Sequence, residues 1–355
     1  MFKKTDPNLQ LDIFTAPSMQ LGSRASKKYS APNAWHNQFY CLVTTKIDEE
    51  IFKPLFPEGK KSGRPNASIR ILVAMSVLKE GFGCSDEDLF EKCEFDLLTR
   101  KALGMELLTD VTPSIDTYYL FRRRICEYQE RTGIDLMQLC FEQLAGKHVH
   151  LLKISGKCVR MDSKLIGSNI ARQSRYELIH TTLVKFLKTC TLTHLSPEQE
   201  ERAKEYLKED SSKTVYRSDS DTLQNNLARI GNFIMEMLAV FPATSPAHDL
   251  LLRLFEEQYV VMDGKAVLRD KKEVKADSLQ NPNDPDATYR AKNDQKVQGY
   301  VTNITETVEE GKPNIITSVQ VETAVFADCH FLQEAVENSE RVTDSTIEDL
   351  YADGA

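Results

Sequence analysis

The spacing of apolar residues changes near residue 151, and this change constrains the fold more than any other feature of the chain. Before it, apolar side chains recur every three or four residues, as helices require. After it, the stretches 151–155 and 157–162 have the pattern of β-strands, and the second ends in Asp162. A chain of 355 residues is long enough for two or three folding units. We therefore predict a helical domain over 35–150 and a mixed domain over 151–355.

The segment ahead of the helical domain, residues 1–34, is polar and contains Pro7, Pro17 and Gly22, which predicts an extended arm. A helix is expected from about Ser68 to Glu80. A second helix should begin at Ser85, which is a good N-cap followed by an acidic first turn.

A third helix should open at Thr112–Thr117 and carry Arg122, Arg123 and Arg124. Two helices around a glycine turn, followed by a basic helix, are the outline of a helix-turn-helix-like DNA-binding unit. A helical bundle with a solvated basic face fits the same pattern.

The mixed domain returns to helical spacing soon after Asp162. We expect a helical insertion over residues 163–262, followed by an irregular linker over 263–288 that is rich in Lys, Asp, Asn and Pro. The helices of the insertion should cover residues 170–188, 197–208, 219–240 and 247–260.

Strands return at 288–303 and 315–325, whose spacing predicts a β-hairpin. A helix over 329–337 and a strand over 347–353 follow. This β-β-β-α-β order is that of the opening half of the ribonuclease H-like fold, in which the first and fourth strands lie side by side. The expected class is therefore α+β: an all-α N-terminal domain and a ribonuclease H-like α/β domain, interrupted by the insertion and incomplete at its C-terminus.

Asp162 and Asp353 would end these two neighbouring strands. Carboxylates so placed can hold divalent cations, which activate a hydroxyl and neutralise charge on a phosphodiester. A single aspartate at the end of a strand is commonplace and is often a turn residue or a helix cap. The pair on adjacent strands favours phosphodiester chemistry.

Composition leaves the partner open. The net charge is −8, but phosphates respond to local clusters of cations such as Lys60, Lys61 and Arg64. The eight cysteines lack the spacing of metal ligands or of a disulfide framework. With no signal peptide and no apolar run of membrane length, we expect a cytoplasmic, nucleoid-associated protein.

Several long blocks together resemble bacterial insertion-sequence transposases of the DDE class that have an InsH-like N-terminal domain. The similarity extends over about residues 8–355. Its blocks are Phe39–Phe56, Arg64–Met75, Thr112–Arg123, Gly156–Ile179 around Asp162, Asp284–Lys292, Gln298–Thr307 and the closing Tyr351–Ala355.

The resemblance implies a protein that cleaves and transfers the ends of a DNA element with Mg²⁺ or Mn²⁺. It implies that Asp162 and Asp353 are the first two catalytic acids and metal ligands. No residue matches the third acid, a glutamate, so we expect a chain truncated before it and inactive alone. Alternatives are a non-catalytic DNA-binding remnant or inhibitor of transposition, one half of a frameshifted gene, and an unrelated nuclease.

The expected partners are DNA carrying the terminal inverted repeats of the element and, by family, further copies of the chain; no membrane is expected. Arginine suits phosphate contacts because its planar fork matches phosphate oxygens. A solvated strand edge is the alternative for Arg290 and Lys292, and an N-cap role is expected of Asp328. The candidate DNA contacts are Lys60, Lys61, Arg64, Arg122, Arg123, Arg124, Arg172, Arg175, Arg290 and Lys292.

Overall fold

The computed structural model describes residues 17–56, 66–242, 245–292 and 295–352, together with Phe2 and Lys4. The fold is mixed α+β and divides into two compact units. The first unit comprises Met1–Arg160, Glu306–Ser318 and Val336–Tyr351, and the second comprises Met161–Thr305, Val319–Ala335 and Ala352–Ala355. The strands of the main sheet contribute residues to both units.

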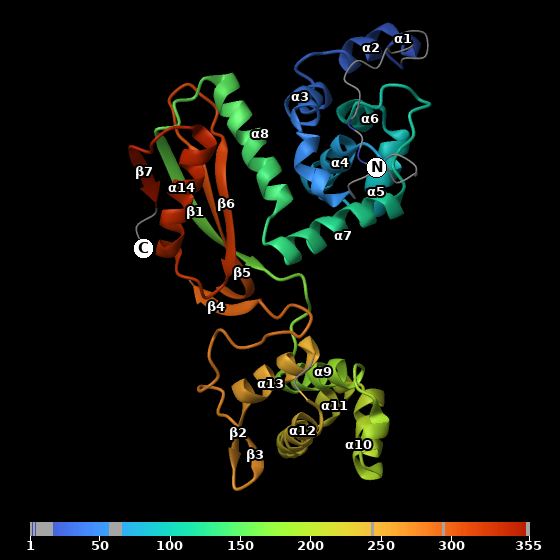
Figure 1. The fold of residues 1–355 in the computed structure, drawn as a ribbon, viewed down its shortest axis with the longest axis vertical. Helices are drawn as coiled ribbons and strands as arrows, with labels where there is room; N and C mark the ends of the chain where they lie inside the picture. Colours follow the sequence, from blue (N-terminus) through green and yellow to red (C-terminus); the bar gives the residue numbers. More distant parts are fainter. Residues whose placement is uncertain are drawn as a thin grey trace. The chain divides into compact units, whose positions relative to one another are not determined.

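The first unit begins with a series of helices around one apolar core, which includes Phe52, Ile69, Leu89 and Tyr118 (Figure 1). None of the helices in the described ranges is both long and apolar enough to cross a bilayer. The helices are α1 (Pro17–Gln20), α2 (Ser23–Tyr29), α3 (Trp35–Leu42), η2 (Thr44–Lys46), η3 (Glu49–Leu55), α4 (Ile69–Phe82), α5 (Asp86–Phe95), α6 (Leu97–Leu103), α7 (Ile115–Thr132) and α8 (Leu136–Leu152).

Local capping explains where these helices begin and end. Ser68 and Ser114 accept hydrogen bonds from the first turns of α4 and α7. Ser85 and Asp88 form a reciprocal capping box at the start of α5, which confirms the predicted N-cap. Gly83, with a φ of 60°, ends α4 in the left-handed conformation that glycine adopts without strain.

Two predictions for this unit were wrong. The expected extended arm contains α1 and α2 within its described part. The expected strand over 151–155 is partly helix, because α8 continues to Leu152 and Lys153 then takes a left-handed conformation. A short apolar run fits a buried helix end as well as a strand.

The helical insertion lies in the second unit and has its own apolar core, which includes Ile179, Leu183, Phe233 and Leu254 (Figure 1). The four predicted helices are present, but the first begins five residues later than expected, and a further helix, α11, was not predicted. The elements are α9 (Arg175–Leu187), η4 (Leu192–His194), α10 (Pro197–Lys208), α11 (Ser211–Arg217), α12 (Ser220–Val240) and α13 (Pro246–Gln258).

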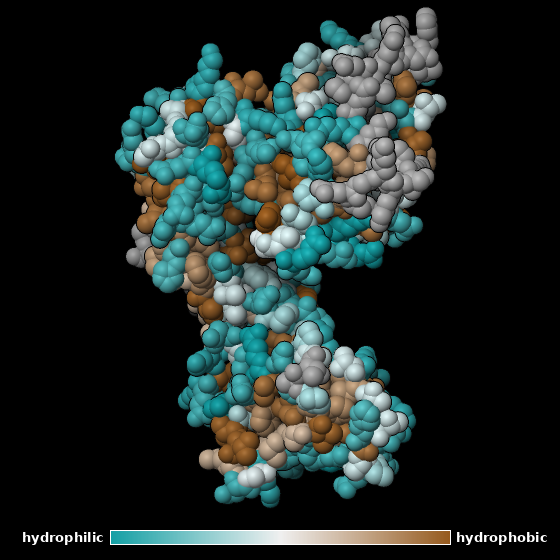
Figure 2. Space-filling model, in the orientation of Figure 1, coloured by the Kyte–Doolittle hydropathy of each residue, from teal (hydrophilic) through white to brown (hydrophobic). Residues whose placement is uncertain are grey.

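A small hairpin, β2 (Tyr259–Met262) and β3 (Lys265–Leu268), follows α13. Its two-residue turn places Asp263 and Gly264 at positive φ, the geometry that Asp-Gly favours. The predicted linker is therefore wrong for 265–268, whereas 269–287 contains neither helix nor strand. Figure 2 shows an apolar patch over this hairpin, where Met262 is exposed.

In the described part of the chain, the main sheet has five strands: four follow the order β4-β5-β1-β7, and β6 pairs with β5. The first and fourth strands of the expected order, β1 and β7, are therefore neighbours, as the sequence predicted. The strands are β1 (Cys158–Gly167), β4 (Thr288–Lys292), β5 (Gln295–Thr307), β6 (Ile316–Thr323) and β7 (Asp349–Ala352). Between β6 and β7 lie η5 (Asp328–Phe331) and α14 (Leu332–Thr343).

The helix α14 packs on β6 largely through polar side chains. In the first unit, Asn338 Nδ2 donates to Ser318 Oγ at 3.1 Å, and the hydroxyls of Thr317 and Ser339 lie 2.7 Å apart. All four side chains are buried. Buried polar groups specify one arrangement when their hydrogen bonds are made, so these contacts fix the position of α14 on the strand.

Candidate functional site

Asp162 is the fifth residue of the ten-residue strand β1, and its side chain is exposed. The prediction that this strand ends in the aspartate was wrong. The strand continues to Gly167, and the amide of Ser168 still donates to the carbonyl of Gln298 on β5 at 2.8 Å. Strand pairing with β5 therefore holds the backbone on both sides of Asp162.

Two backbone hydrogen bonds at the ends of β1 and β5 show how the two strands are aligned. Ser168 bonds to Gln298 at one end, and the amide of Val308 donates to the carbonyl of Cys158 at the other end. These bonds are ten residues apart on both strands, so the antiparallel register between them is continuous. It places Asp162 opposite Ile304, whose side chain is 40% exposed.

The side chains on the exposed face of β1 alternate in charge around Asp162. Arg160, Asp162 and Lys164 are all exposed, because every second residue of a strand points to the same face. Arg160 is neutralised within the first unit by Glu306, whose Oε1 lies 2.5 Å from both Nε and Nη2.

Lys164 has no ion pair among the described residues. Lys164 is not among the residues predicted from the sequence, although its two-residue spacing from Asp162 on a strand places both side chains on one face. An exposed cation beside an exposed carboxylate suits a phosphate ligand better than the carboxylate alone.

Asp353, the second predicted acid, lies outside the described residues. The strand that precedes it, β7, ends at Ala352 and pairs with β1. Among the described residues, no three His, Cys, Asp or Glu side chains come together as a metal site would require. Asp162 is exposed there, and the described residues do not make a complete Mg²⁺ site.

Arg290 lies on β4, but its guanidinium is held inside the second unit. Its Nη1 lies 3.0 Å from Phe326 O, 3.3 Å from Ala324 O and 3.0 Å from the Asp328 carboxylate. The N-cap of η5 is Ala327, and Asp328 is the first residue of that helix, so the predicted N-cap role of Asp328 is wrong. Its carboxylate pairs with Arg290. These contacts give Arg290 a structural role.

The two arginines that follow β1 differ in their surroundings. Arg172 is exposed, and its Nη2 donates to Lys296 O at 2.8 Å. Arg175 is the first residue of α9 and donates to Gln258 Oε1 at 2.7 Å. Burial lowers the pKa of Arg175 below its ordinary value. Only Arg172 is therefore positioned to contact a ligand from solvent; the side chain of Lys292 lies outside the described residues.

The carboxylate of Asp284, in the segment before β4, contacts the residue that follows β1. Asp284 accepts a hydrogen bond from Tyr300 and another, 2.5 Å long, from Ser168 Oγ. Burial and the bond to Asp284 both raise the pKa of Tyr300. Tyr300 is therefore a neutral donor that anchors residue 284 to the sheet.

In the N-terminal helices, Lys60, Lys61 and Arg64 lie outside the described residues, whereas the three predicted arginines of α7 are described. Arg122 and Arg123 are exposed, and their ion pairs, with Asp86 and Glu127, are long at 3.9 and 3.7 Å. Arg124 is partly buried, with its guanidinium 5.7 Å from the centre of the Phe56 ring. Long, exposed ion pairs are weak, so Arg122 and Arg123 are available to a polyanion.

The helix that follows the glycine turn, α5, is acidic on its exposed surface. Glu87, Glu91 and Glu94 lie on it at helical spacing. A recognition helix enters the groove between two phosphate backbones, where such a surface is repelled. The helix-turn-helix prediction therefore gains no support from α5; the predicted basic helix corresponds to α7.

Comparison with known families identifies one similarity. Residues 30–124 match a family described as a transposase domain (DUF772). The matched segment extends from Ser30 to Arg124 and so includes the three arginines of α7. Searches of curated proteins and of solved structures gave no match. The matched segment supports a relationship of this chain to transposases.

Proposed function

We propose that this chain is a DNA-binding transposase of the DDE class, encoded by a bacterial insertion sequence. The observation that carries the proposal is the transposase-domain match over residues 30–124. The resemblance of the stretches around Asp162 and Asp353 to catalytic blocks of that class extends the proposal to the rest of the chain.

The proposed DNA contact is made by Arg122 and Arg123 on α7. Two consecutive exposed arginines with only weak internal partners can each bind a phosphate. Such contacts release counterions, so binding should weaken steeply as salt rises. The exposed Arg172 and Lys164 would add contacts in the second unit.

The proposed metal ligands are Asp162 and Asp353. Asp162 lies on β1, and Asp353 directly follows β7 in the sequence, the strand that pairs with β1. Mg²⁺ or Mn²⁺ bound there would supply a Lewis acid for phosphoryl transfer. This chemistry ordinarily uses three carboxylates in the class that the sequence resembles, and no third is assigned here. We therefore propose that the 355-residue chain binds the ends of its element and does not cleave them by itself.

DNA binding tests the first part of the proposal. Fluorescence anisotropy with labelled duplexes from both flanks of the gene should show a preferred duplex and a linear fall of log K with log salt. The double variant Arg122→Ala/Arg123→Ala should flatten the salt slope by about 2. Arg217→Ala, an exposed arginine on α11, is the matched control. Equal affinity of the double variant and the parent would refute the α7 contact.

Cleavage of the same duplexes in Mg²⁺ or Mn²⁺ tests the second part. We expect none from this chain. Cleavage that Asp162→Asn abolishes would contradict the proposed inactivity and support the acid's role. The alternative function is that of an inhibitor that occupies the ends; it predicts that this chain lowers transposition by an active relative. Absence of specific binding would exclude both.

A further inference from the structure

The helix α5 presents an acidic stripe, Glu87, Glu91 and Glu94, which occupies one side of the helix at spacings of four and three residues. All three side chains are exposed, and none has an ion pair among the described residues. Within the described part of the first unit, this anionic surface therefore has no ion-pair partner, and a DNA-binding function does not explain it.

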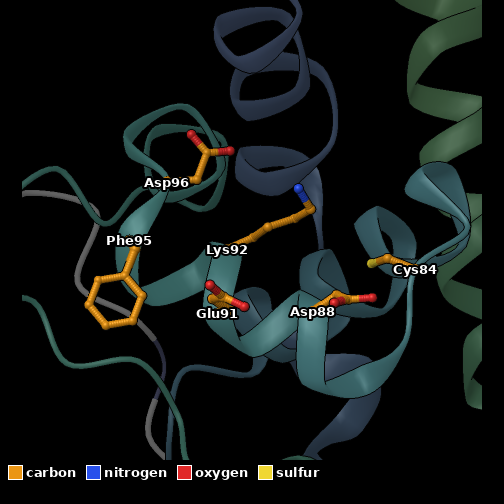
Figure 3. Close-up of a pocket in the computed structure, with 6 residues that line it drawn as sticks. All are labelled: Cys84, Asp88, Glu91, Lys92, Phe95 and Asp96. Atoms are coloured by element: carbon orange, nitrogen blue, oxygen red, sulfur yellow. The ribbon is translucent and has the colours of Figure 1, made fainter.

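An exposed aromatic ring stands at the end of this stripe. Phe95, the last residue of α5, is 75% exposed. It borders a hollow of about 520 Å³, and Figure 3 shows Lys92, another lining residue, extending away from the ring. The ammonium of Lys92 lies 5.6 Å from the centre of the Phe82 ring. Phe95 is thus a projecting apolar group with acidic neighbours, and a partner for it must be concave, apolar and basic.

The same chain carries such a surface on α2. Arg24, Lys27 and Lys28 are exposed at spacings of three and one residues, and none has an ion pair among the described residues. Arg24 and Lys28 also line a recess of about 460 Å³ together with Gly22, Ser23 and Ala25. The small side chains and the methylene stems of the two cations give this recess an apolar lining.

We propose that α5 of one copy docks on α2 of a second copy, with Phe95 in the recess between Arg24 and Lys28. The acidic stripe would then lie against the cations of α2. The two surfaces are therefore complementary: the carboxylates and the ring of α5 would meet the cations and the recess of α2. A two-fold dimer forms this contact twice, because each copy contributes both surfaces.

DNA is the competing ligand for α2, since its three cations could bind phosphates. It does not account for α5, whose carboxylates repel a polyanion. A contact between α5 and α2 accounts for both the acidic stripe and the exposed ring. The inference does not depend on the proposed function, because it concerns association in the absence of DNA.

The test is the mass of the full chain in solution without DNA, measured by sedimentation velocity and light scattering up to about 100 µM, a range that detects weak dimers. We expect a dimer that dissociates in high salt. Phe95→Ser, the pair Glu91→Lys/Glu94→Lys and the pair Arg24→Glu/Lys28→Glu should each give monomers. Combining the two charge-reversal pairs should restore the dimer.

Tyr216→Ser is the matched control, because Tyr216 is 91% exposed on α11 and lies outside both surfaces. It should leave the dimer unchanged, and circular dichroism should show that each variant is folded. A monomeric parent would overturn the proposal. Failure of the combined variant to restore the dimer would exclude α2 as the partner. Loss of DNA binding without a change of mass in Arg24→Glu/Lys28→Glu would assign α2 to DNA instead.

Discussion

Asp162 on β1 lies directly across from Ile304 on β5, so the proposed metal ligand has an apolar cross-strand neighbour. Neither side chain is buried. The hydrogen-bonded register around the pair is continuous, which fixes the backbone of Asp162. An exposed carboxylate on a fixed backbone, with no side-chain partner among the described residues, contributes little to folding and can bind a ligand.

Asp162→Asn should therefore leave the stability of the chain almost unchanged. Exposed substitutions without partners shift the free energy of unfolding by about 0.5 kcal/mol or less. Urea denaturation of the parent and the variant measures the difference. A loss of about 2 kcal/mol or more would show that Asp162 has a structural role and would weaken its assignment as a metal ligand.

Gly299 on β5 should tolerate no side chain. A Cβ atom there would lie 2.2 Å from the carbonyl oxygen of Ile166 and 2.6 Å from the amide of Ser168. These are backbone atoms of the strand that carries Asp162, so Gly299→Ala must separate β1 from β5. We expect a loss of about 3 kcal/mol in the free energy of unfolding.

Gly81→Ala is the matched control for this substitution. Gly81 lies in α4, and a Cβ atom there has no neighbour within 4 Å. Alanine at that position should stabilise the chain by about 0.5–1 kcal/mol, because it restricts the unfolded state. Equal effects of the two substitutions on the denaturation midpoint would show that the close approach at Gly299 is unimportant.

Local signals in the sequence predicted much of the fold. The start of α5 followed from Ser85 and its acidic first turn, and the pairing of β1 with β7 followed from the order of the elements. The length of β1 was not predicted, because an aspartate is common at the end of a strand, whereas this strand continues past Asp162 to Gly167. The β2–β3 hairpin was missed although Asp263-Gly264 is a typical turn pair, since the surrounding charges suggested a linker.

The candidate site was harder to predict, because its contacts join distant residues. Arg290 contacts carbonyl oxygens 34 and 36 residues later, and no local pattern reveals such a partner. The exposure of Arg122 and Arg123, by contrast, follows from the amphipathic pattern of α7. The exposure of a side chain is therefore easier to predict from the sequence than its contacts with residues that are distant along the chain.

Arg290→Met should destabilise the second unit. The substitution removes hydrogen bonds to Ala324 and Phe326 and leaves the Asp328 carboxylate without this cation, and the Arg290 side chain is only 24% exposed. Loss of a largely buried charged donor costs about 2 kcal/mol. Thermal unfolding should show a lower midpoint than in Arg217→Ala, the exposed control. A full loss of DNA affinity at unchanged stability would contradict the structural role and restore Arg290 as a DNA contact.

The histidine at position 180 should make stability depend on pH. His180 is buried in α9, and its Nε2 lies 3.1 Å from Tyr206 O. Burial lowers the pKa of His180 below its ordinary value of 6.5, an effect that Glu209 partly opposes. In this range the unfolded chain binds the proton more readily than the folded chain. The contribution of the neutral ring is therefore full above pH 6.5 and declines as the pH falls below it.

His180→Gln tests this assignment, because glutamine can still donate a hydrogen bond to Tyr206 O but does not titrate. Urea denaturation at pH 7.5 and 5.5 measures how much the free energy of unfolding falls between these two pH values. The fall should be larger in the parent than in the variant. One proton limits the difference to about 1.4 kcal/mol per pH unit. His194→Gln, on the exposed η4 turn, should keep the parent's pH dependence. An identical pH dependence in His180→Gln and the parent would mean that protonation of His180 does not affect the free energy of unfolding, although the ring packs near Tyr176 and Tyr206.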